Sequence, residues 1–173
     1  MEPMTPNVTP SSWQAFRTAE PAFAVTVQKR FQQYRHHVLA TLRVDGSPRV
    51  TGLEVNFRMD TLWLGMMPNS RKALDLRRDP RFALQANPGP DAEMADGDVR
   101  VSGRAVEVTD DAVRARFAEE VTPPEPYLLF RADPTEVVRT GIDGEDIVLQ
   151  LWRPGHPLRT LRRKGDESPV RES

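Results

Sequence analysis

Short apolar segments separated by turn dipeptides restrict the fold of this chain more than any other feature. Asp45-Gly46 and Asp143-Gly144 each separate two such segments, and the Asp-Gly dipeptide accepts the positive φ angles of a tight hairpin turn. Segments of this length with turns between them are typical of antiparallel strands. We therefore expect a mainly β fold (α+β) of six to seven strands with short helices. Such a chain forms a closed or half-closed barrel and not a doubly wound sheet.

The expected strands either alternate apolar and polar residues or form short apolar runs. They span His37–Arg43, Pro48–Phe57, Thr61–Met66, Arg81–Asn87, Asp98–Val108, Thr135–Ile142 and Glu145–Trp152. Alternation in the second strand breaks at Gly52, which indicates a bulge or a backbone that something else approaches closely. Tyr127–Arg131 fits a short helix as well as a strand, and the sequence does not separate the two.

Helices are expected between the strands where the period of the apolar residues changes. They begin at Pro21 and span Ser70–Asp79 and Asp111–Glu120. Proline suits the first turn of the first helix, and Pro80 ends the second because proline cannot continue a helix. The charged residues from Asp75 to Arg81 are expected to cover an exposed helix surface with internal ion pairs.

The chain of 173 residues has the length of one domain. The periodic segments lie within residues 13–161, which form the expected folded domain. Residues 1–12 are rich in Pro, Thr and Ser and are expected to be a flexible N-terminal arm, and the polar residues 162–173 a disordered tail. Hydrophobic residues make up 38% of the chain, which supports a modest core that a partner chain would help to complete.

Charge and composition exclude several functional classes. The 24 Lys and Arg residues against 25 Asp and Glu residues give a net charge of -1, so the chain lacks the basic field that nucleic acids require. The absence of cysteine excludes disulfides, thiolate metal sites and cysteine nucleophiles. No apolar run approaches the about 20 residues that span a bilayer, and the first residues lack a secretory pattern. We therefore expect a cytoplasmic protein with no membrane or nucleic-acid partner.

The start of the second expected helix is the strongest candidate for a binding site. A strand leads into a helix whose first turn carries Ser70, Arg71 and Lys72, with Asn69 or Ser70 as its N-cap. Helix N-termini present unpaired N–H groups and the positive end of the helix dipole. With two cations added, the segment forms a candidate cradle for a phosphate monoester. Taken alone, the residues fit a simple cap with two solvated cations slightly better, because surface cations are common.

The order and spacing of several segments carry a family resemblance. LATLRVDGSPRV, TLWLGMMPNSRKALDLRRDPRFAL, VRVSGRAVEV and LQLWRPG resemble segments of the pyridoxamine 5′-phosphate oxidase-like superfamily, over roughly residues 37–159. The resemblance implies an FMN-binding split β-barrel that forms a homodimer with cofactor sites at the interface. Members use FMN or the deazaflavin coenzyme F-420. Some relatives bind haem, which no residue of this chain selects.

The same resemblance implies a set of cofactor-binding residues. Those expected to hold the phosphate are Arg49, Ser70, Arg71 and Lys72. The residues expected to line the ring are Val50 and Thr51, through their backbone groups, and Met66 and Met67. Trp152 of the partner subunit is expected to close the pocket. Without the resemblance, Arg49 fits a surface charge on a hairpin and Trp152 fits ordinary core packing.

Two positions depart from the true oxidase of this family. The oxidase has a lysine where this chain has Glu54, and a glutamine where the nearest match is Asp98. The basic residues that hold the oxidase's phosphorylated substrate have no counterpart, so the resemblance does not extend to that substrate. Glu54 and His156 are the substrate-side candidates. The three histidines are scattered along the chain and indicate no metal site.

The expected function is a flavin- or deazaflavin-dependent oxidoreductase that transfers hydride to or from a small organic substrate. The cofactor ring carries the chemistry in such enzymes, so no catalytic residue is assigned. The alternative is a non-catalytic carrier or sensor that binds flavin, haem or another tetrapyrrole on the same fold. A third hypothesis is a dimeric scaffold that has lost its ligand. The choice of FMN or deazaflavin, the substrate and the direction of transfer stay open.

Overall fold

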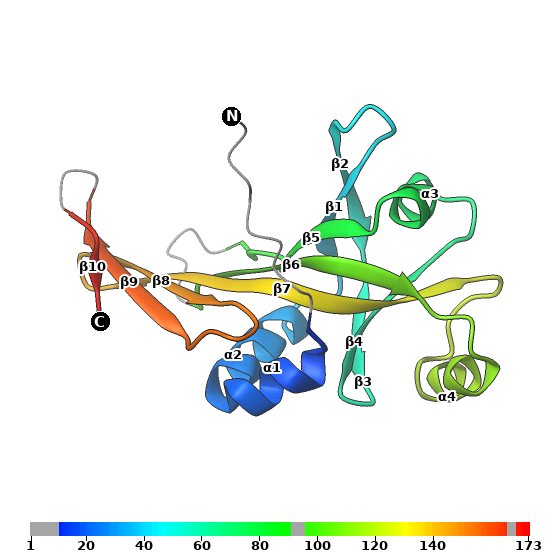
Figure 1. Cartoon of the computed structure of the whole chain (residues 1–173), viewed down its shortest axis with the longest axis horizontal. Coiled ribbons are helices and arrows are strands. Elements are labelled where there is room, and N and C mark those ends of the chain that lie inside the picture. The colour runs from blue at the N-terminus through cyan, green and yellow to red at the C-terminus, as the bar shows by residue number, and fades with distance from the viewer. Residues whose placement is uncertain (1–10, 91–95, 166–168) are drawn as a thin grey trace.

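The structure is a computed structural model that describes residues 11–90, 96–165 and 169–173. Within these ranges the chain forms a ten-stranded antiparallel sheet with short helices around it (Figure 1). The sheet does not close on itself, as in a split β-barrel. The expected mainly β fold with short helices is confirmed, and the strands outnumber the six to seven that the sequence predicts.

The elements follow one another along the chain with short connections. The strands are β1 (His37–Leu42), β2 (Pro48–Leu53), β3 (Val55–Arg58), β4 (Thr61–Met66), β5 (Arg81–Gln85), β6 (Asp98–Glu107), β7 (Leu128–Asp143), β8 (Asp146–Trp152), β9 (Arg159–Lys164) and β10 (Arg171–Glu172). The helices are α1 (Trp13–Ala19), α2 (Pro21–Gln32), α3 (Arg71–Arg78) and α4 (Asp111–Val121). None of the described helices has the length and apolar character needed to cross a lipid bilayer.

β7 is the longest strand and organises the sheet. It pairs with β6 over most of its length, and its other edge is divided, since residues 128–131 pair with β4 and residues 137–143 pair with β8. The hydrogen-bonded order is β10-β9-β8-β7-β6-β5-β1-β2, with β3 attached through β4. As a result, β8 to β10 lie at one end of the molecule, and β1 to β4 lie toward the other end with α3 and α4 (Figure 1).

The expected strand Pro48–Phe57 is two strands. The chain leaves the ladder at Glu54, because β2 pairs with β1 whereas β3 pairs with β4. The expected bulge at Gly52 is not formed, because Gly52 lies within the regular β1–β2 ladder opposite Val38.

Tyr127–Arg131 and Thr135–Ile142, treated separately from the sequence, are largely parts of the single strand β7. Pro134 lies in the middle of this strand, where a proline normally interrupts pairing. The register between β6 and β7 shifts between Ser102 and Gly103, and such a bulge accommodates the missing N–H of the proline.

The two ends of the chain contain regular structure that the sequence did not indicate. α1 is an additional helix, capped by Ser12, whose hydroxyl accepts a hydrogen bond from the Ala15 N–H at 3.1 Å. Residues 162–164 complete β9 and Arg171–Glu172 form β10, so the expected disordered tail is wrong for these residues. Backbone pairing with β8 orders β9 without requiring apolar side chains. Residues 1–10 of the expected arm and residues 166–168 of the tail lie outside the described residues.

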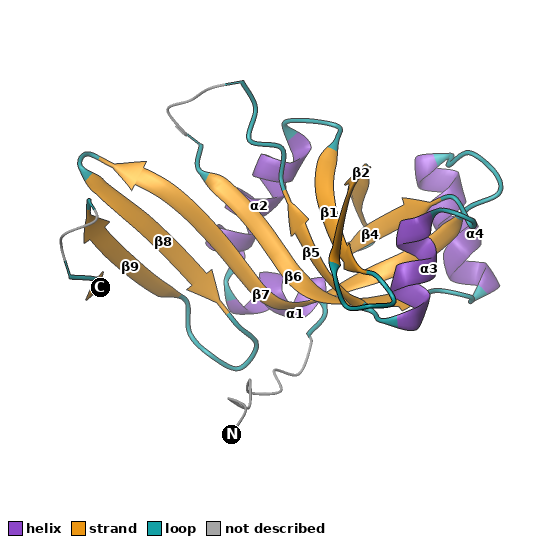
Figure 2. Cartoon of the chain, turned by 90° about the horizontal axis from the view of Figure 1, so that it is seen from above, coloured by secondary structure: helices purple, strands orange, loops and turns teal. Residues whose placement is uncertain are grey.

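The main core lies between α1, α2 and the sheet (Figure 2). Trp13, Phe16 and Trp152 are almost fully buried in it, and the ring of Phe16 lies 4.6 Å from that of Trp152. A second, smaller cluster joins α4 to β4 and the start of β7 through Trp63, Phe117, Tyr127 and Leu129. This second cluster fixes α4 against the sheet and so builds one side of the candidate site.

Candidate functional site

A pocket of about 520 Å³ lies where α3 and α4 meet the β2–β4 end of the sheet. Its walls are the strands β2 to β4, the segment from the end of α4 to the start of β7, and the loop between α2 and β1. The second wall is apolar and includes Phe117, Tyr127 and three prolines, whereas Arg35, Glu54 and Lys72 bring charged groups. Its volume lies in the range of about 300–1,000 Å³ that is usual for ligand and cofactor sites.

Two glycines leave bare backbone on the wall of this pocket. Gly52 of β2 and Gly65 of β4 both line it, and a Cβ built on either residue would meet no atom within 4 Å. Neither residue has a positive φ angle, so the backbone conformation does not require glycine. Glycine inside a strand weakens the strand. The described neighbours of these two glycines therefore do not require glycine, and the bare backbone at both positions faces the pocket.

The start of α3 forms one side of the same region. Ser70 is its N-cap, and the Ser70 hydroxyl accepts from the Ala73 N–H at 3.4 Å and donates to the Met67 carbonyl at 2.8 Å. The hydroxyl predicted to contact phosphate is thus engaged in capping the helix. Of the first turn, the backbone N–H groups of Arg71 and Lys72 remain available, because the first N–H groups of a helix have no intrahelical acceptors.

Lys72 connects α3 to the glycine wall. Its Nζ atom donates to the Gly52 carbonyl at 2.7 Å, and burial lowers the pKa of this lysine from its ordinary value. An ammonium group has three donors, so the bond to Gly52 leaves two of them for a ligand. Arg71 is exposed beside it, and no hydrogen bond or ion pair of its side chain is found within the described ranges. The two cations predicted from the sequence therefore lie at the start of one helix, with Lys72 on the pocket wall.

Arg49 does not stand as a free surface charge. Its Nε atom donates to Asp75 Oδ2 at 2.6 Å, and the same carboxylate oxygen accepts from the Thr41 hydroxyl at 2.8 Å. Arg78 approaches the other carboxylate oxygen at 3.3 Å. Burial raises the pKa of Asp75, but the bonds from Arg49 and Thr41 outweigh it, so the pKa lies below its ordinary value.

The expectation that Asp75 belongs to an exposed helix surface is wrong, because its side chain is only 4% exposed. The face of α3 that carries Asp75 packs against β1 and β2. A buried carboxylate is stable there because arginine and hydroxyl donors surround it.

Val50 and Thr51 lie on opposite faces of β2, and neither lines the pocket. Val50 is exposed, whereas the Thr51 hydroxyl oxygen is buried and has no hydrogen-bond partner within the described part of the chain. The methionines at the end of β4 and directly after it do line the pocket: Met66 is buried there, and Met67 is exposed.

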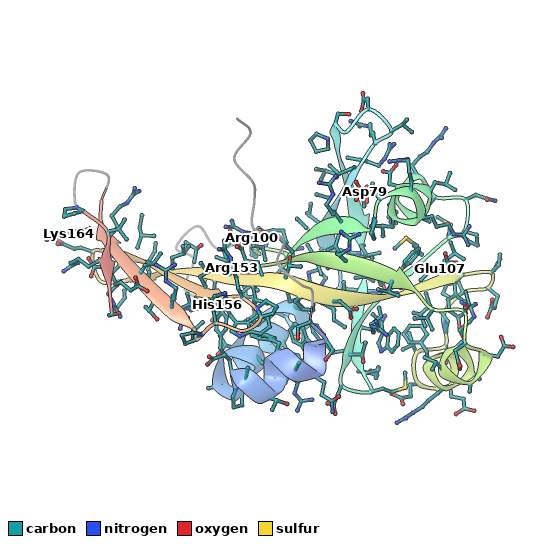
Figure 3. All side chains as sticks on the ribbon, in the orientation of Figure 1. Asp79, Arg100, Glu107, Arg153, His156 and Lys164 are labelled. Carbon is teal, nitrogen blue, oxygen red and sulfur yellow. The ribbon has the colours of Figure 1, made fainter. Side chains whose placement is uncertain are left out.

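The two substrate-side candidates are separated. Glu54 lines the pocket, where its Oε1 atom lies 2.9 Å from Arg35 Nε and 3.8 Å from His36 Nδ1. His156 lies on the loop between β8 and β9, on the side of α1 and α2 (Figure 3), and does not line the pocket. His156 is therefore not part of this site within one chain.

Trp152 does not close the pocket in this structure. Its side chain packs against Phe16 in the main core and is 2% exposed, so its ring is not available to reach a second chain. Trp152 is therefore an ordinary core residue in this structure, as is common for a single tryptophan. Its indole Nε1 atom is buried without a hydrogen-bond partner among the described residues.

Sequence reasoning missed the whole apolar wall of the pocket. Phe117, Val121 and Tyr127 come from the end of α4 and the segment after it, and only the pairing of β4 with β7 brings them beside Gly65. The prolines at 123, 124 and 126 indicate a rigid connection but not what that connection faces. Arg35 and Asn56 were missed for the same reason, since nothing in their local sequence marks them.

The donor set fits a flat ligand that carries a phosphate. The glycine wall accepts a ring, and Lys72, Arg71 and the start of α3 supply cationic and N–H donors for an anion. Among the described residues, no group of His, Asp and Glu side chains could hold a metal ion.

Comparison with known proteins agrees with the fold. The family model described as pyridoxamine 5′-phosphate oxidase matches residues 24–141, more than half of the chain. An FMN-binding pyridoxamine 5′-phosphate oxidase-related protein from Nostoc punctiforme is 18% identical with a TM-score of 0.54, covering 89% of this chain and 94% of that one. No curated protein matches the chain.

Two further solved structures share the architecture. HutZ, the haem storage protein from Vibrio cholerae, is 18% identical with a TM-score of 0.52, covering 80% of this chain and 96% of that one. PhzG from Burkholderia lata, in complex with tetrahydrophenazine-1-carboxylic acid, is 16% identical with a TM-score of 0.52, covering 91% of this chain and 90% of that one. At these identities the likeness concerns the fold alone. By its family match and its split barrel, the chain belongs to the pyridoxamine 5′-phosphate oxidase-like family.

Proposed function

We propose that this protein binds a phosphate-bearing flavin, either FMN or the deazaflavin coenzyme F-420, and works with it as an oxidoreductase. The observation that carries the proposal is the meeting of two features in one pocket. Bare backbone at Gly52 and Gly65 faces open space, and the Lys72 ammonium group is held beside Gly52. The first feature suits a flat ring and the second suits a phosphate. An FMN-binding protein with the same fold supports this class of ligand.

Each residue has a distinct part in this proposal. Lys72, Arg71 and the first N–H groups of α3 bind the phosphate, while Gly52 and Gly65 border the ring. The apolar wall at Phe117 limits access of water to the ring. When bound, the flavin or deazaflavin ring supplies the hydride-transfer chemistry. The chain's own contribution is binding, orientation and exclusion of water.

The polar groups left over in the pocket are assigned to a small organic substrate. Arg35, Glu54 and Asn56 line the pocket, and the Arg35–Glu54 pair is partly exposed to solvent. Glu54 is already neutralised by Arg35 at 2.9 Å, so a substrate group would exchange with that pair. Because Arg35 is already paired with Glu54, this side of the pocket offers no unpaired cation to a second phosphate, which argues against pyridoxamine 5′-phosphate as the substrate.

We also propose that the protein is a cytoplasmic homodimer. Apolar side chains on the exposed side of β1 and β2, Val38 at 40% and Val50 at 66% exposed, support a partner surface next to the cofactor region. The absence of cysteine fits a reducing compartment. The oligomeric state is measured by sedimentation with and without FMN, and a monomer under both conditions would contradict this part.

A non-catalytic carrier is the second candidate, supported by the haem storage protein that shares the fold. The two candidates differ in what happens after the cofactor is reduced. In an oxidoreductase, some organic acceptor reoxidises the reduced, protein-bound cofactor faster than buffer does. In a carrier or sensor, none does.

The binding proposal is tested by titrating the purified protein with FMN, riboflavin and F-420 while following absorption and flavin fluorescence. The double variant Arg71→Ala with Lys72→Ala removes two charge-assisted bonds, each of about 1.5–3 kcal/mol. We expect FMN affinity to fall at least about 100-fold and riboflavin affinity to change little.

The matched control for this variant is Arg77→Ala. Arg77 lies on the same helix but forms a two-bond ion pair with Glu107 at 2.7 and 2.8 Å, so we expect no change in FMN affinity. If the wild-type protein binds neither cofactor, or if the double variant binds FMN as well as the wild type, the proposed function is wrong.

A further inference from the structure

Asp75 occupies an unusual place for an anion. It lies on α3, one helical turn after Arg71, on the helix that we propose binds phosphate. Its carboxylate is 4% exposed and accepts from three side chains, those of Thr41, Arg49 and Arg78. A negative charge so close to an anion site weakens anion binding unless neighbouring cations compensate it. The carboxylate of Asp75 at this position therefore needs an explanation.

The geometry of Arg49 offers that explanation. Arginine has five N–H donors in a rigid plane and a long, flexible side chain. Asp75 takes the Nε donor of Arg49 at 2.6 Å, and the terminal nitrogens of Arg49 have no partner within the described ranges. The ion pair therefore holds the guanidinium group of Arg49 against α3. It leaves the terminal N–H donors of that group free for another acceptor.

Arg78 and Thr41 complete the arrangement. Thr41 on β1 donates to the same carboxylate oxygen as Arg49 does, at 2.8 Å, so the carboxylate is fixed from a neighbouring strand. Arg78 donates to the other oxygen and also to the Leu42 carbonyl. Because two arginines surround one carboxylate, the cluster keeps a net positive charge.

We propose that Asp75 is a positioning residue, which orients Arg49 so that its terminal donors contact the cofactor's phosphate. This inference rests on the proposed function, because it requires a phosphate-bearing ligand at the start of α3. Asp75 itself touches no ligand in this arrangement and acts only through Arg49.

The experiment compares the dissociation constants of FMN and riboflavin, two ligands that differ only in the phosphate. For Asp75→Asn we expect the FMN dissociation constant to rise about 10-fold, within the range for residues coupled by direct contact. We expect the riboflavin constant to change less than about 2-fold. A residue with only a structural role would weaken both ligands equally, and a residue that merely repels phosphate would give tighter FMN binding when neutralised. Either result overturns the proposal.

Two further variants keep the test decisive. In the double variant Arg49→Met with Asp75→Asn, FMN affinity should equal that of Arg49→Met alone, because Asp75 has nothing left to orient. An additional loss in the double variant contradicts the proposal.

If Asp75→Asn lowers the folded fraction, as seen by circular dichroism, Thr41→Val is measured in its place. It keeps the carboxylate and removes one neutral donor, and we expect an FMN-specific loss of about 3-fold. Unaltered FMN affinity in that variant overturns the proposal as well. If the wild-type protein binds no FMN, the proposed function itself is wrong. If the wild type binds FMN and the variants bind it with unchanged affinity, only the proposed role of Asp75 is wrong.

Discussion

The core under α1 and α2 and the pocket beside α3 differ in how completely packing explains their residues. In the core, Phe16 is fully buried and its ring contacts those of Trp13, Phe23 and Trp152, so stability alone explains its presence. In the pocket, Gly65 weakens its own strand and Lys72 is partly desolvated. Residues that the fold does not need are the ones to assign to a ligand.

The glycines make the same contrast at single positions. A Cβ on Gly103 would lie 2.2 Å from the Asp133 carbonyl oxygen, whereas a Cβ on Gly65 would meet nothing within 4 Å. Gly103 is required by the close approach of β6 and β7 at the bulge. Gly65 is required by no neighbour, which makes the space in front of it the explanation.

The largest expected effect is in the core. Phe16→Ala removes a fully buried ring and should lower the free energy of unfolding by about 3–5 kcal/mol, measured by urea denaturation. FMN affinity of the folded protein should stay within about 2-fold, because the changed ring lies outside the pocket. A large loss of affinity in folded protein would show that core and pocket are not independent.

Gly65→Val should lower FMN affinity without lowering stability, the opposite of what Phe16→Ala should do. The valine side chain fills the space in front of β4, so FMN affinity should fall at least about 100-fold, or about 2.7 kcal/mol. The free energy of unfolding should not fall, since valine favours strands. Gly103→Ala is the control, and it should destabilise the fold while leaving FMN affinity of the folded fraction unchanged. If Gly65→Val binds FMN with wild-type affinity, the proposal that the cofactor ring lies against Gly65 is wrong.

The pH dependence of binding tests Lys72 more finely. Burial lowers its pKa below the ordinary 10.5, so its positive charge is lost at a lower pH than that of a surface lysine. FMN affinity, relative to riboflavin affinity, should therefore decline as pH rises toward 10.5, at lower pH than for a surface lysine and by up to about 10-fold. Lys72→Arg stays charged over this range and should abolish the decline. If FMN affinity still declines with pH in the Lys72→Arg variant, a titrating group other than Lys72 causes the decline.

The smallest expected effect concerns His37, away from the pocket. Burial lowers the pKa of His37 from 6.5, and its Nδ1 atom accepts from the Asn87 N–H at 3.1 Å. The folded state therefore binds a proton less readily than the unfolded state. The free energy of unfolding should fall as pH drops below about 6.5, by less than about 1.4 kcal/mol per pH unit. His37→Gln should reduce this slope in thermal or urea unfolding curves.

Local signals in the sequence predicted local structure well. Asp-Gly turns, alternation and the Ser70 cap identify most strands and all of α3. They failed where a partner strand decides the outcome. Pro134 lies inside β7 next to a bulge in the pairing with β6, and β9 forms because β8 lies beside it. α1 was missed because its Trp and Phe sit in a segment that follows a Pro- and Ser-rich stretch.

The candidate site was predictable only in part. Lys72 and Gly52 carry visible signals, a cation at a helix start and a break in alternation, and the structure joins them by one hydrogen bond. Asp75 gave the wrong signal, because a charged residue among arginines looks solvated until Thr41 and Arg49 pack over it. The wall at Phe117 depends on strand pairing far along the chain, which no local pattern reports.

Because β4 and β8 divide one edge of β7 between them, a shortened chain cannot simply end after β7. Removing β8 to β10 would leave residues 137–143 of β7 with unpaired backbone groups along that edge, and such an edge pairs readily with other chains. The truncated protein would retain every residue of the pocket and still be prone to aggregation. Any minimal version of this protein must therefore keep the distant hairpin as a cover for the strand.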